Sequence, residues 1–238
     1  MKYFELKCTI YIKANIEFSR SFEILSKYIS TAMVKGGFEN THKNNMFKYY
    51  NYGGLLPIEK DGIYKKGSSY SFSIRSLNES LIDALSQSLR ENINDNNILV
   101  VQTEKKTVKQ FFITELYSAT PVIVSTENGK FWTMKESGDI LQLQKQLHDN
   151  LEKKYQSFFK EKLKSPQNFI QLLEIKNRVP QNIQIHKNNK RIRFFGNKFK
   201  IIPNEDELSQ KLAFTALACG VGEKNSYGGG FCLGRGLK

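Results

Sequence analysis

The residues best suited to binding an anion lie near the end of the chain. Residues 220–230 read GVGEKNSYGGG and contain five glycines. Glycines allow the backbone to approach a phosphate or a base closely, and bare amide groups can point at an anion. The alternative is a flexible tail with tight turns and no ligand. We take as candidate binding residues Gly220, Gly222, Lys224, Ser226, Gly228 and Gly230.

Two common phosphate-binding motifs are excluded for this segment. It follows a predicted helix rather than a strand, and Asn225 stands where a dinucleotide fingerprint needs its third glycine. No G-x-x-x-x-G-K-S/T sequence occurs in the chain, which excludes a P-loop. Metal-ligand spacings of His, Cys and acidic residues are absent as well, and we expect neither a metal site nor a cofactor.

A second candidate site combines Tyr28, on a predicted helix, with His42 and Lys48 in the polar segment that follows. An imidazole with its usual pKa of about 6.5 moves protons readily near neutral pH. The neighbours of His42 are polar, which argues against a core histidine. Spacing alone favours a plain surface histidine, so the catalytic interpretation stays open at this point.

A third candidate is a basic segment in which Arg191, Arg193, Lys198 and Lys200 alternate with apolar residues. The two-residue period of a strand would place the cations on one face and the apolar side chains on the other. A basic strand face suits an RNA backbone. An ordinary solvated hairpin fits the same pattern equally well.

Composition supports a polyanion as partner. The 238 residues carry 36 Lys and Arg against 23 Asp and Glu, for a formal charge of +13, and residues 141–200 hold most of the excess. Such a block binds a polyanion in a salt-dependent manner, although a solvated basic surface is the simpler reading. The chain has no apolar run long enough for a membrane span and no apolar leader at its start. We therefore expect a cytoplasmic protein that does not bind a membrane.

The element order of the first half predicts a β-α-β-β-α-β unit. Residues 3–13 alternate as a strand, and a helix capped by Ser19 or Ser21 follows. A strand at 70–74 and a helix at 77–89 come next, and then two strands separated by a charged turn at 103–107. This is the split unit of a ferredoxin-like sheet, an architecture that RNA-recognition domains use.

The second half predicts the same unit in degenerate form. Ser137 or Asp139 begins a long helix, and a helix that ends at Gly220 follows the basic strands. We expect the strand at 190–195 to pair with 198–202 around Gly196 and Asn197. The predicted fold class is α+β, with two tandem ferredoxin-like (RRM-like) domains at residues 1–117 and 118–238, the second degenerate.

Taken together, these residues resemble a known family. The glycine-rich tail after a helix, the phrase SATPVIV at 118–124 and the stretch from Phe47 through Pro57 to residues 70–72 are similar to CRISPR-associated repeat-processing endoribonucleases of the RAMP superfamily. The similarity runs along nearly the whole chain. Gly220-Val221-Gly222 matches the family pattern, whereas Gly229 replaces an expected hydrophobic residue.

The resemblance implies two ferredoxin-like domains and metal-independent cleavage of the repeat in precursor CRISPR RNA. It implies that Tyr28, His42 and Lys48 are catalytic, with Lys43 as the rival of Lys48 and an RNA-binding residue in its own right. In such a reaction the ribose 2′-OH attacks its own 3′-phosphate, which leaves a 2′,3′-cyclic phosphate and a 5′-OH. The implied partners are repeat RNA and other Cas proteins, and a homodimer stays open. The alternatives are a non-catalytic RNA-binding RAMP subunit and a general polyanion-binding module.

Overall fold

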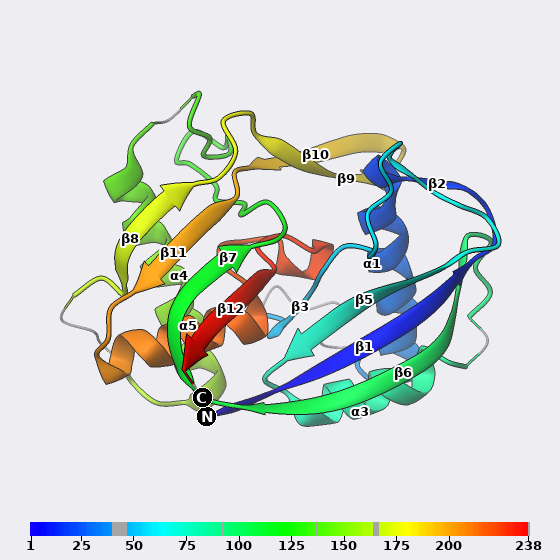
Figure 1. The fold of residues 1–238 in the computed structure, drawn as a ribbon, viewed down its shortest axis with the longest axis horizontal. Helices are drawn as coiled ribbons and strands as arrows, with labels where there is room; N and C mark the ends of the chain where they lie inside the picture. Colours follow the sequence, from blue (N-terminus) through cyan, green and yellow to red (C-terminus); the bar gives the residue numbers. More distant parts are fainter. Residues whose placement is uncertain (40–46, 92, 137, 164–166, 238) are drawn as a thin grey trace.

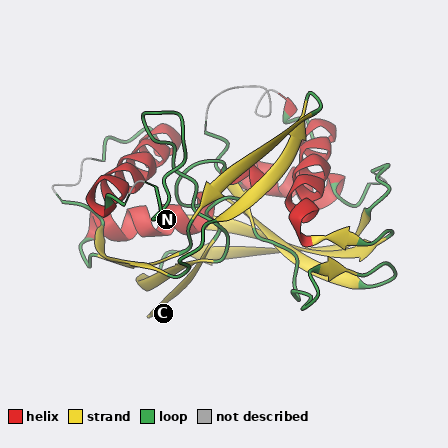
Figure 2. Ribbon diagram, turned by 90° about the horizontal axis from the view of Figure 1, so that it is seen from above, coloured by secondary structure: helices red, strands yellow, loops and turns green. Residues whose placement is uncertain are grey.

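The computed structural model describes residues 1–39, 47–91, 93–136, 138–163 and 167–237. These residues form two four-stranded antiparallel sheets, two short two-stranded pairs and the helices that pack on them (Figure 1). Seen from above, the helices gather on one side of the strands of both sheets (Figure 2). No helix in these ranges is both long and apolar enough to cross a membrane.

The first sheet has the strand order β3-β5-β1-β6. Its unit contains, in chain order, β1 (Lys2–Ile12), α1 (Phe18–Lys35), β3 (Tyr50–Tyr52), β5 (Ser69–Ser76), α3 (Glu79–Ser88) and β6 (Ile98–Lys109). A short pair, β2 (Ile16–Glu17) with β4 (Ile63–Tyr64), lies beside it. Alternation along β1 buries Leu6, Cys8 and Ile10 under the two helices. Helix α1 begins after Glu17, which makes no side-chain cap bond, so the predicted caps Ser19 and Ser21 are wrong.

The predicted turn at 103–107 is also wrong. Strand β6 runs from Ile98 to Lys109 and pairs with β1 from end to end, with one register shift at Val101. It is the edge strand of the sheet, so charged side chains reach water without breaking the ladder. Lys105, at the centre of the supposed turn, forms ion pairs with Glu79 and Asp83 of α3.

The second sheet has the strand order β12-β7-β11-β8. Its unit contains β7 (Phe112–Ser118), α4 (Ile140–Phe159), β8 (Ile170–Ile175), β11 (Phe199–Pro203), α5 (Glu207–Cys219) and β12 (Cys232–Leu237). In both sheets the strands of the unit lie in the order fourth, first, third, second. The predicted pair of ferredoxin-like units is therefore confirmed, and the second departs from the simple pattern by an inserted hairpin between β8 and β11.

Two aspartates begin the helices of the second unit, as short polar N-cap residues commonly do. The Asp139 carboxylate accepts a hydrogen bond from the Gln142 amide at 2.9 Å, and Asp206 accepts one from Ser209 at 3.0 Å.

The chain passes from the first sheet to the second between β6 and β7, because β7 pairs with β11 and β12. The division of the chain at residues 117 and 118 stays a prediction.

The inserted hairpin consists of β9 (Gln181–Lys187) and β10 (Lys190–Gly196), which pair with each other around Asn188 and Asn189. The predicted pairing of residues 190–195 with 198–202 is therefore wrong. The buried Asn197 carries the chain from β10 into the second sheet: its Nδ2 donates to the Asn177 carbonyl at 2.8 Å, and its own carbonyl accepts from the Val122 amide at 2.9 Å.

The hairpin lies across the molecule and covers α1 of the first unit (Figure 1). Ile183, Ile185 and Phe194 join the hydrophobic core of the first half. At the same contact, His186 Nδ1 lies 2.9 Å from the Glu23 carboxylate. The insertion thereby attaches the second unit to the first helix through apolar packing and this polar contact.

Gly196 permits the close passage between the hairpin and residues 122–123. A Cβ there would lie 2.2 Å from the Val122 carbonyl oxygen. We expect Gly196→Ala to lower the free energy of unfolding by about 1–3 kcal/mol, measured by urea denaturation. Gly54→Ala, where a Cβ would meet only Phe22 Cζ at 3.4 Å, is the matched control. Equal stability of the two variants would contradict this account.

Candidate functional site

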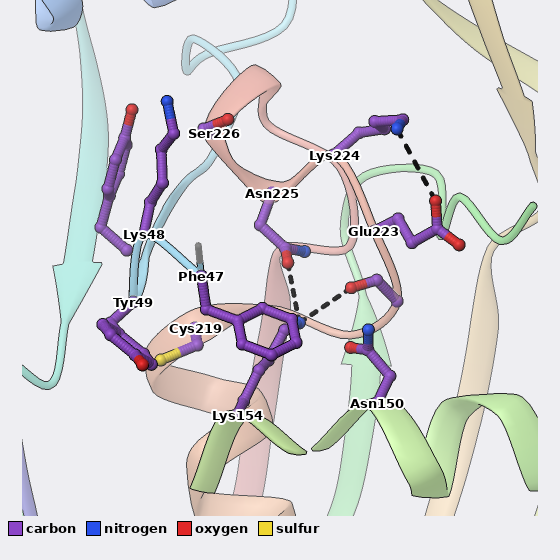
Figure 3. Close-up of a pocket in the computed structure, with 12 residues that line it drawn as sticks. Phe47, Lys48, Tyr49, Asn150, Lys154, Cys219, Glu223, Lys224, Asn225 and Ser226 are labelled. Carbon is purple, nitrogen blue, oxygen red and sulfur yellow. Dashed lines mark hydrogen bonds and ion pairs between the residues drawn. The ribbon is translucent and has the colours of Figure 1, made fainter. Parts of the chain in front are cut away.

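A pocket of about 360 Å³ lies where the glycine-rich segment faces the chain that follows the first helix (Figure 3). Its walls come from residues 47–50, from Asn150 and Lys154 of α4, and from residues 219 and 222–226. Chain segments that are far apart in the sequence thus form one cavity. Three lysines and one glutamate line it, and the Glu223 carboxylate accepts hydrogen bonds from the Ser125 amide and hydroxyl.

The glycine-rich segment folds into a compact loop rather than a flexible tail. The Val221 amide donates to the Gly230 carbonyl at 2.9 Å, and the Gly230 amide donates to Pro121 at 2.8 Å. A 3-10 turn, η1 (Asn225–Tyr227), forms its tip. Gly230 has a φ of +67°, and a Cβ on it would lie 1.9 Å from the Val221 carbonyl oxygen. The loop therefore needs glycine here for both its backbone angle and its close approach.

The Lys154 side chain holds this loop from α4, and the sequence interpretation missed it. Its Nζ donates to the carbonyls of Gly220 and Gly222, each at 2.8 Å, and to Asn225 Oδ1 at 2.7 Å. The residue is only 3% exposed, and burial lowers the pKa of its ammonium group to about 8. One signal was available: Lys154 continues the apolar stripe of Leu147 and Leu151 at helical spacing, an unusual place for a charge.

Several predicted site residues meet at the pocket. Lys48, Gly222, Lys224 and Ser226 all line it, with Lys48 and Ser226 on one side and Lys154 reaching in from α4 (Figure 3). Lys48 is half-buried, which lowers the pKa of its ammonium group. Lys224 Nζ lies 3.7 Å from Glu223 Oε2. Gly220, Gly228 and Gly230 belong to the same loop, at positions where a Cβ would collide with neighbouring atoms.

His42 and Lys43 lie outside the described residues. The described chain resumes at Phe47, whose ring lines the pocket beside Lys48.

Tyr28 does not reach this pocket. It lies in the core with 1% of its surface exposed. Its hydroxyl donates to the Leu89 carbonyl at 3.3 Å and accepts from the Val100 amide at 3.4 Å. These are the contacts of a core tyrosine whose polar end is satisfied by backbone groups. Its catalytic role stays a prediction, and the described contacts offer it no path to a ligand.

The four cations of the basic segment do not share one face as expected. Arg191 and Arg193 are exposed on β10 of the hairpin, and Arg191 Nε donates to Gln184 Oε1 at 2.6 Å. Lys198 is half-buried, which lowers the pKa of its ammonium group. Lys200 lies in the second sheet, where its Nζ pairs with the Glu115 carboxylate at 3.0 Å. The segment divides at Gly196 and Asn197 because β10 and β11 belong to different sheets.

One group of side chains on α4 has potential metal ligands. Ligand atoms of His148, Asp149 and Glu152 lie within 4.8 Å of one another. His148 Nδ1, however, accepts a hydrogen bond from the Phe169 amide at 3.1 Å, and its Nε2 lies 3.2 Å from Glu152. Both ring nitrogens thus have protein partners, which is the arrangement of a structural histidine.

Comparison with known families agrees with the loop and the fold. The family described as "CRISPR associated protein Cas6, C-terminal" matches residues 100–233, more than half of the chain. The chain belongs to the Cas6 family. No curated protein matches it in sequence. The resemblance to repeat-processing RAMP proteins is therefore confirmed at the level of the family.

Solved structures share the whole architecture. A structure described as "CRISPR associated protein Cas6" aligns with a TM-score of 0.70 at 21% identity, over 98% of this chain and 99% of that one. "An RAMP protein binding different RNA substrates" aligns at 0.69 with 17% identity, over 98% and 99%. A Thermus thermophilus Cas6 product complex aligns at 0.61 with 13% identity, over 98% and 100%. At these identities the likeness establishes the fold.

The geometry of the loop makes a stability prediction. We expect Gly230→Ala to lower the free energy of unfolding by about 2–4 kcal/mol, because a Cβ is strained at this φ and also collides with Val221. Gly62→Ala isolates the first effect, since Gly62 has a φ of +73° and no atom within 4 Å of a Cβ. Chemical denaturation should show a smaller loss for Gly62→Ala, about 1–2 kcal/mol. A loss at Gly230 no greater than at Gly62 would contradict the collision.

Proposed function

We propose that this protein is an endoribonuclease that cleaves the repeat of precursor CRISPR RNA without a metal ion. The observation that carries the proposal is the pocket that Lys48 and the glycine-rich loop line together. Membership of the Cas6 family supports repeat RNA as the substrate class. The net charge of +13 supports binding to a polyanion.

The substrate contains its own nucleophile in this reaction. The ribose 2′-OH attacks the adjacent phosphorus, the P–O5′ bond breaks, and a 2′,3′-cyclic phosphate and a 5′-OH result. The main task of the protein is to hold the 2′-oxygen, the phosphorus and the leaving oxygen in line. The loop suits this task because its backbone is fixed by internal hydrogen bonds.

We assign proton transfer to His42 and charge stabilisation to Lys48. An imidazole takes the 2′-OH proton or protonates the 5′-oxygen, a contribution of about 10²–10⁴-fold. An ammonium group beside the phosphate stabilises the negative charge that develops on its oxygens. Lys48 is preferred over Lys43 because Lys48 lines the pocket. Lys224 and Ser226, which line the same pocket, are assigned to binding the phosphate.

The exposed cations of the hairpin extend the proposed RNA-binding surface. Arg191 and Arg193 lie on β10 and are open to solvent. Arginine side chains bind phosphates and fix the register of a nucleic acid without reading its sequence. Lys198 and Lys200 contribute less in this proposal, because the first is half-buried and the second pairs with Glu115.

Cleavage of the cognate repeat RNA in EDTA tests the proposal. The wild-type protein should cut the RNA once, and a 2′-deoxy substitution at the cut nucleotide should abolish the cut. His42→Ala should lower the single-turnover rate by about 10²–10⁴-fold and Lys48→Met by about 10²-fold, with the RNA still bound. A strict requirement for Mg²⁺, or an uncut repeat, would refute the assignment.

Tyr28→Phe separates a core role from a catalytic one. Because the hydroxyl contacts only backbone groups, we expect a loss of about 1 kcal/mol in unfolding free energy and a cleavage rate close to that of the wild type. Thermal unfolding and single-turnover kinetics measure the two effects. A cleavage rate as low as that of His42→Ala would show that Tyr28 is catalytic.

A non-catalytic RNA-binding subunit is the second candidate. The observation in its favour is the likeness, at a TM-score of 0.69, to a RAMP protein described as binding different RNA substrates. This alternative predicts binding of the repeat with no cut in any buffer and equal affinity for the wild type and His42→Ala. Similar affinity for duplex DNA and repeat RNA at equal salt would instead indicate a general polyanion binder.

A further inference from the structure

Lys154 makes an unusual set of contacts for a buried lysine. An ammonium group has three N–H donors, and each of the three acceptors around Nζ belongs to the glycine-rich loop. Among the described residues, no carboxylate forms an ion pair with this group. Neutral oxygens therefore hold this buried positive charge, and without a paired carboxylate its removal from water is costly.

Resting on the proposed function, we propose that Lys154 is a positioning residue whose positive charge holds the glycine-rich loop in the form that binds an RNA phosphate. The three bonds turn two loop carbonyls and the Asn225 side-chain oxygen toward α4. In this arrangement Lys224 and Ser226 of the loop line the pocket and are available to an incoming phosphate. Lys154 is one of the residues that line the pocket, and its charge adds to the positive potential there.

The number of donors makes the charge necessary. A neutral amine has two N–H donors and a lone pair, so one of the three acceptors would lose its partner and face that lone pair. An unsatisfied buried carbonyl is unfavourable, and the loop would rearrange to recover a donor. Burial lowers the pKa of Lys154 to about 8, so this change falls within an accessible pH range.

The ionisable groups around Lys154 are two cysteines, the loop residues Glu223 and Lys224, and Lys48 across the pocket. Cys219 of α5 and Cys232 of β12 have pKa values that burial raises to about 12, so both thiols stay protonated. Glu223 of the loop remains bound to Ser125. Across the pocket Lys48 has a pKa that burial lowers, so its titration must be removed by substitution, and Lys224 lies near Glu223.

Binding of an uncleavable repeat RNA, with a 2′-deoxy nucleotide at the cut, tests the inference. Lys154→Met should bind at least about tenfold more weakly than the wild type at pH 7. Lys145→Met is the matched control, because it removes one positive charge from an exposed position of the same helix. It should bind like the wild type, which excludes a simple effect of net charge.

The pH dependence distinguishes positioning by charge from packing. In a Lys48→Arg background, affinity should fall as the pH rises through about 8, and adding Lys154→Met should abolish that step. Linkage predicts the opposite for folding: the cost of the buried charge is relieved above about pH 8, so the Lys154 contribution to stability rises with pH up to about its ordinary 10.5. The contribution of Lys154 to folding therefore does not account for a loss of affinity above about pH 8.

Two results of these binding measurements would overturn the role of Lys154, and a third would refute the proposed function. Wild-type affinity in Lys154→Met, or weaker affinity with no pH step at Lys154, overturns the inference. If Lys154→Met does not fold, the pH series of the Lys48→Arg protein alone decides, since it retains the lysine. Failure of the wild type to bind the repeat RNA at any pH would instead refute the proposed function.

Discussion

The buried carbonyls of the glycine-rich loop need hydrogen-bond donors, and that need links the two halves of the molecule. A loop with few side chains cannot satisfy its own backbone once it is removed from water. Lys154 supplies donors from α4, and Asn51 of β3 donates to the Gly229 carbonyl at 3.2 Å from the first sheet. Asn225 donates to the same carbonyl at 2.8 Å from within the loop. The pocket therefore has rigid walls before any ligand arrives.

The hairpin insertion makes a second connection between the halves, through apolar burial and one polar contact. Its inner face adds Ile183, Ile185 and Phe194 to the core of the first unit, while its outer face keeps Arg191 exposed. The polar contact is between His186 and Glu23, and it fixes β9 on α1. The exposed cations of the hairpin are thus attached to the first unit by both contacts.

Much of the local structure was predictable because it depends on neighbours in the sequence. Asp139 was one of the two predicted first residues of α4, and its short carboxylate satisfies an amide three residues later. Gly220 ends α5 with a φ of +80°. The turn predicted at 103–107 failed because a charged run reads as a loop, although an edge strand tolerates the same charges. The pairing of β10 with β11 was predicted wrongly, because the alternation of polar and apolar residues does not show which sheet a strand belongs to.

The sequence by itself determined two ferredoxin-like units, a glycine-rich loop after the last helix and an excess of positive charge, because periodicity, capping and composition are local properties. Only the tertiary structure decided which cations share a surface and which residues form the pocket. Lys200 pairs with Glu115, Tyr28 lies in the core, and Lys154 reaches the loop from a helix some 70 residues away. Such partners are set by the packing of distant elements, whose contacts leave almost no mark on local spacing.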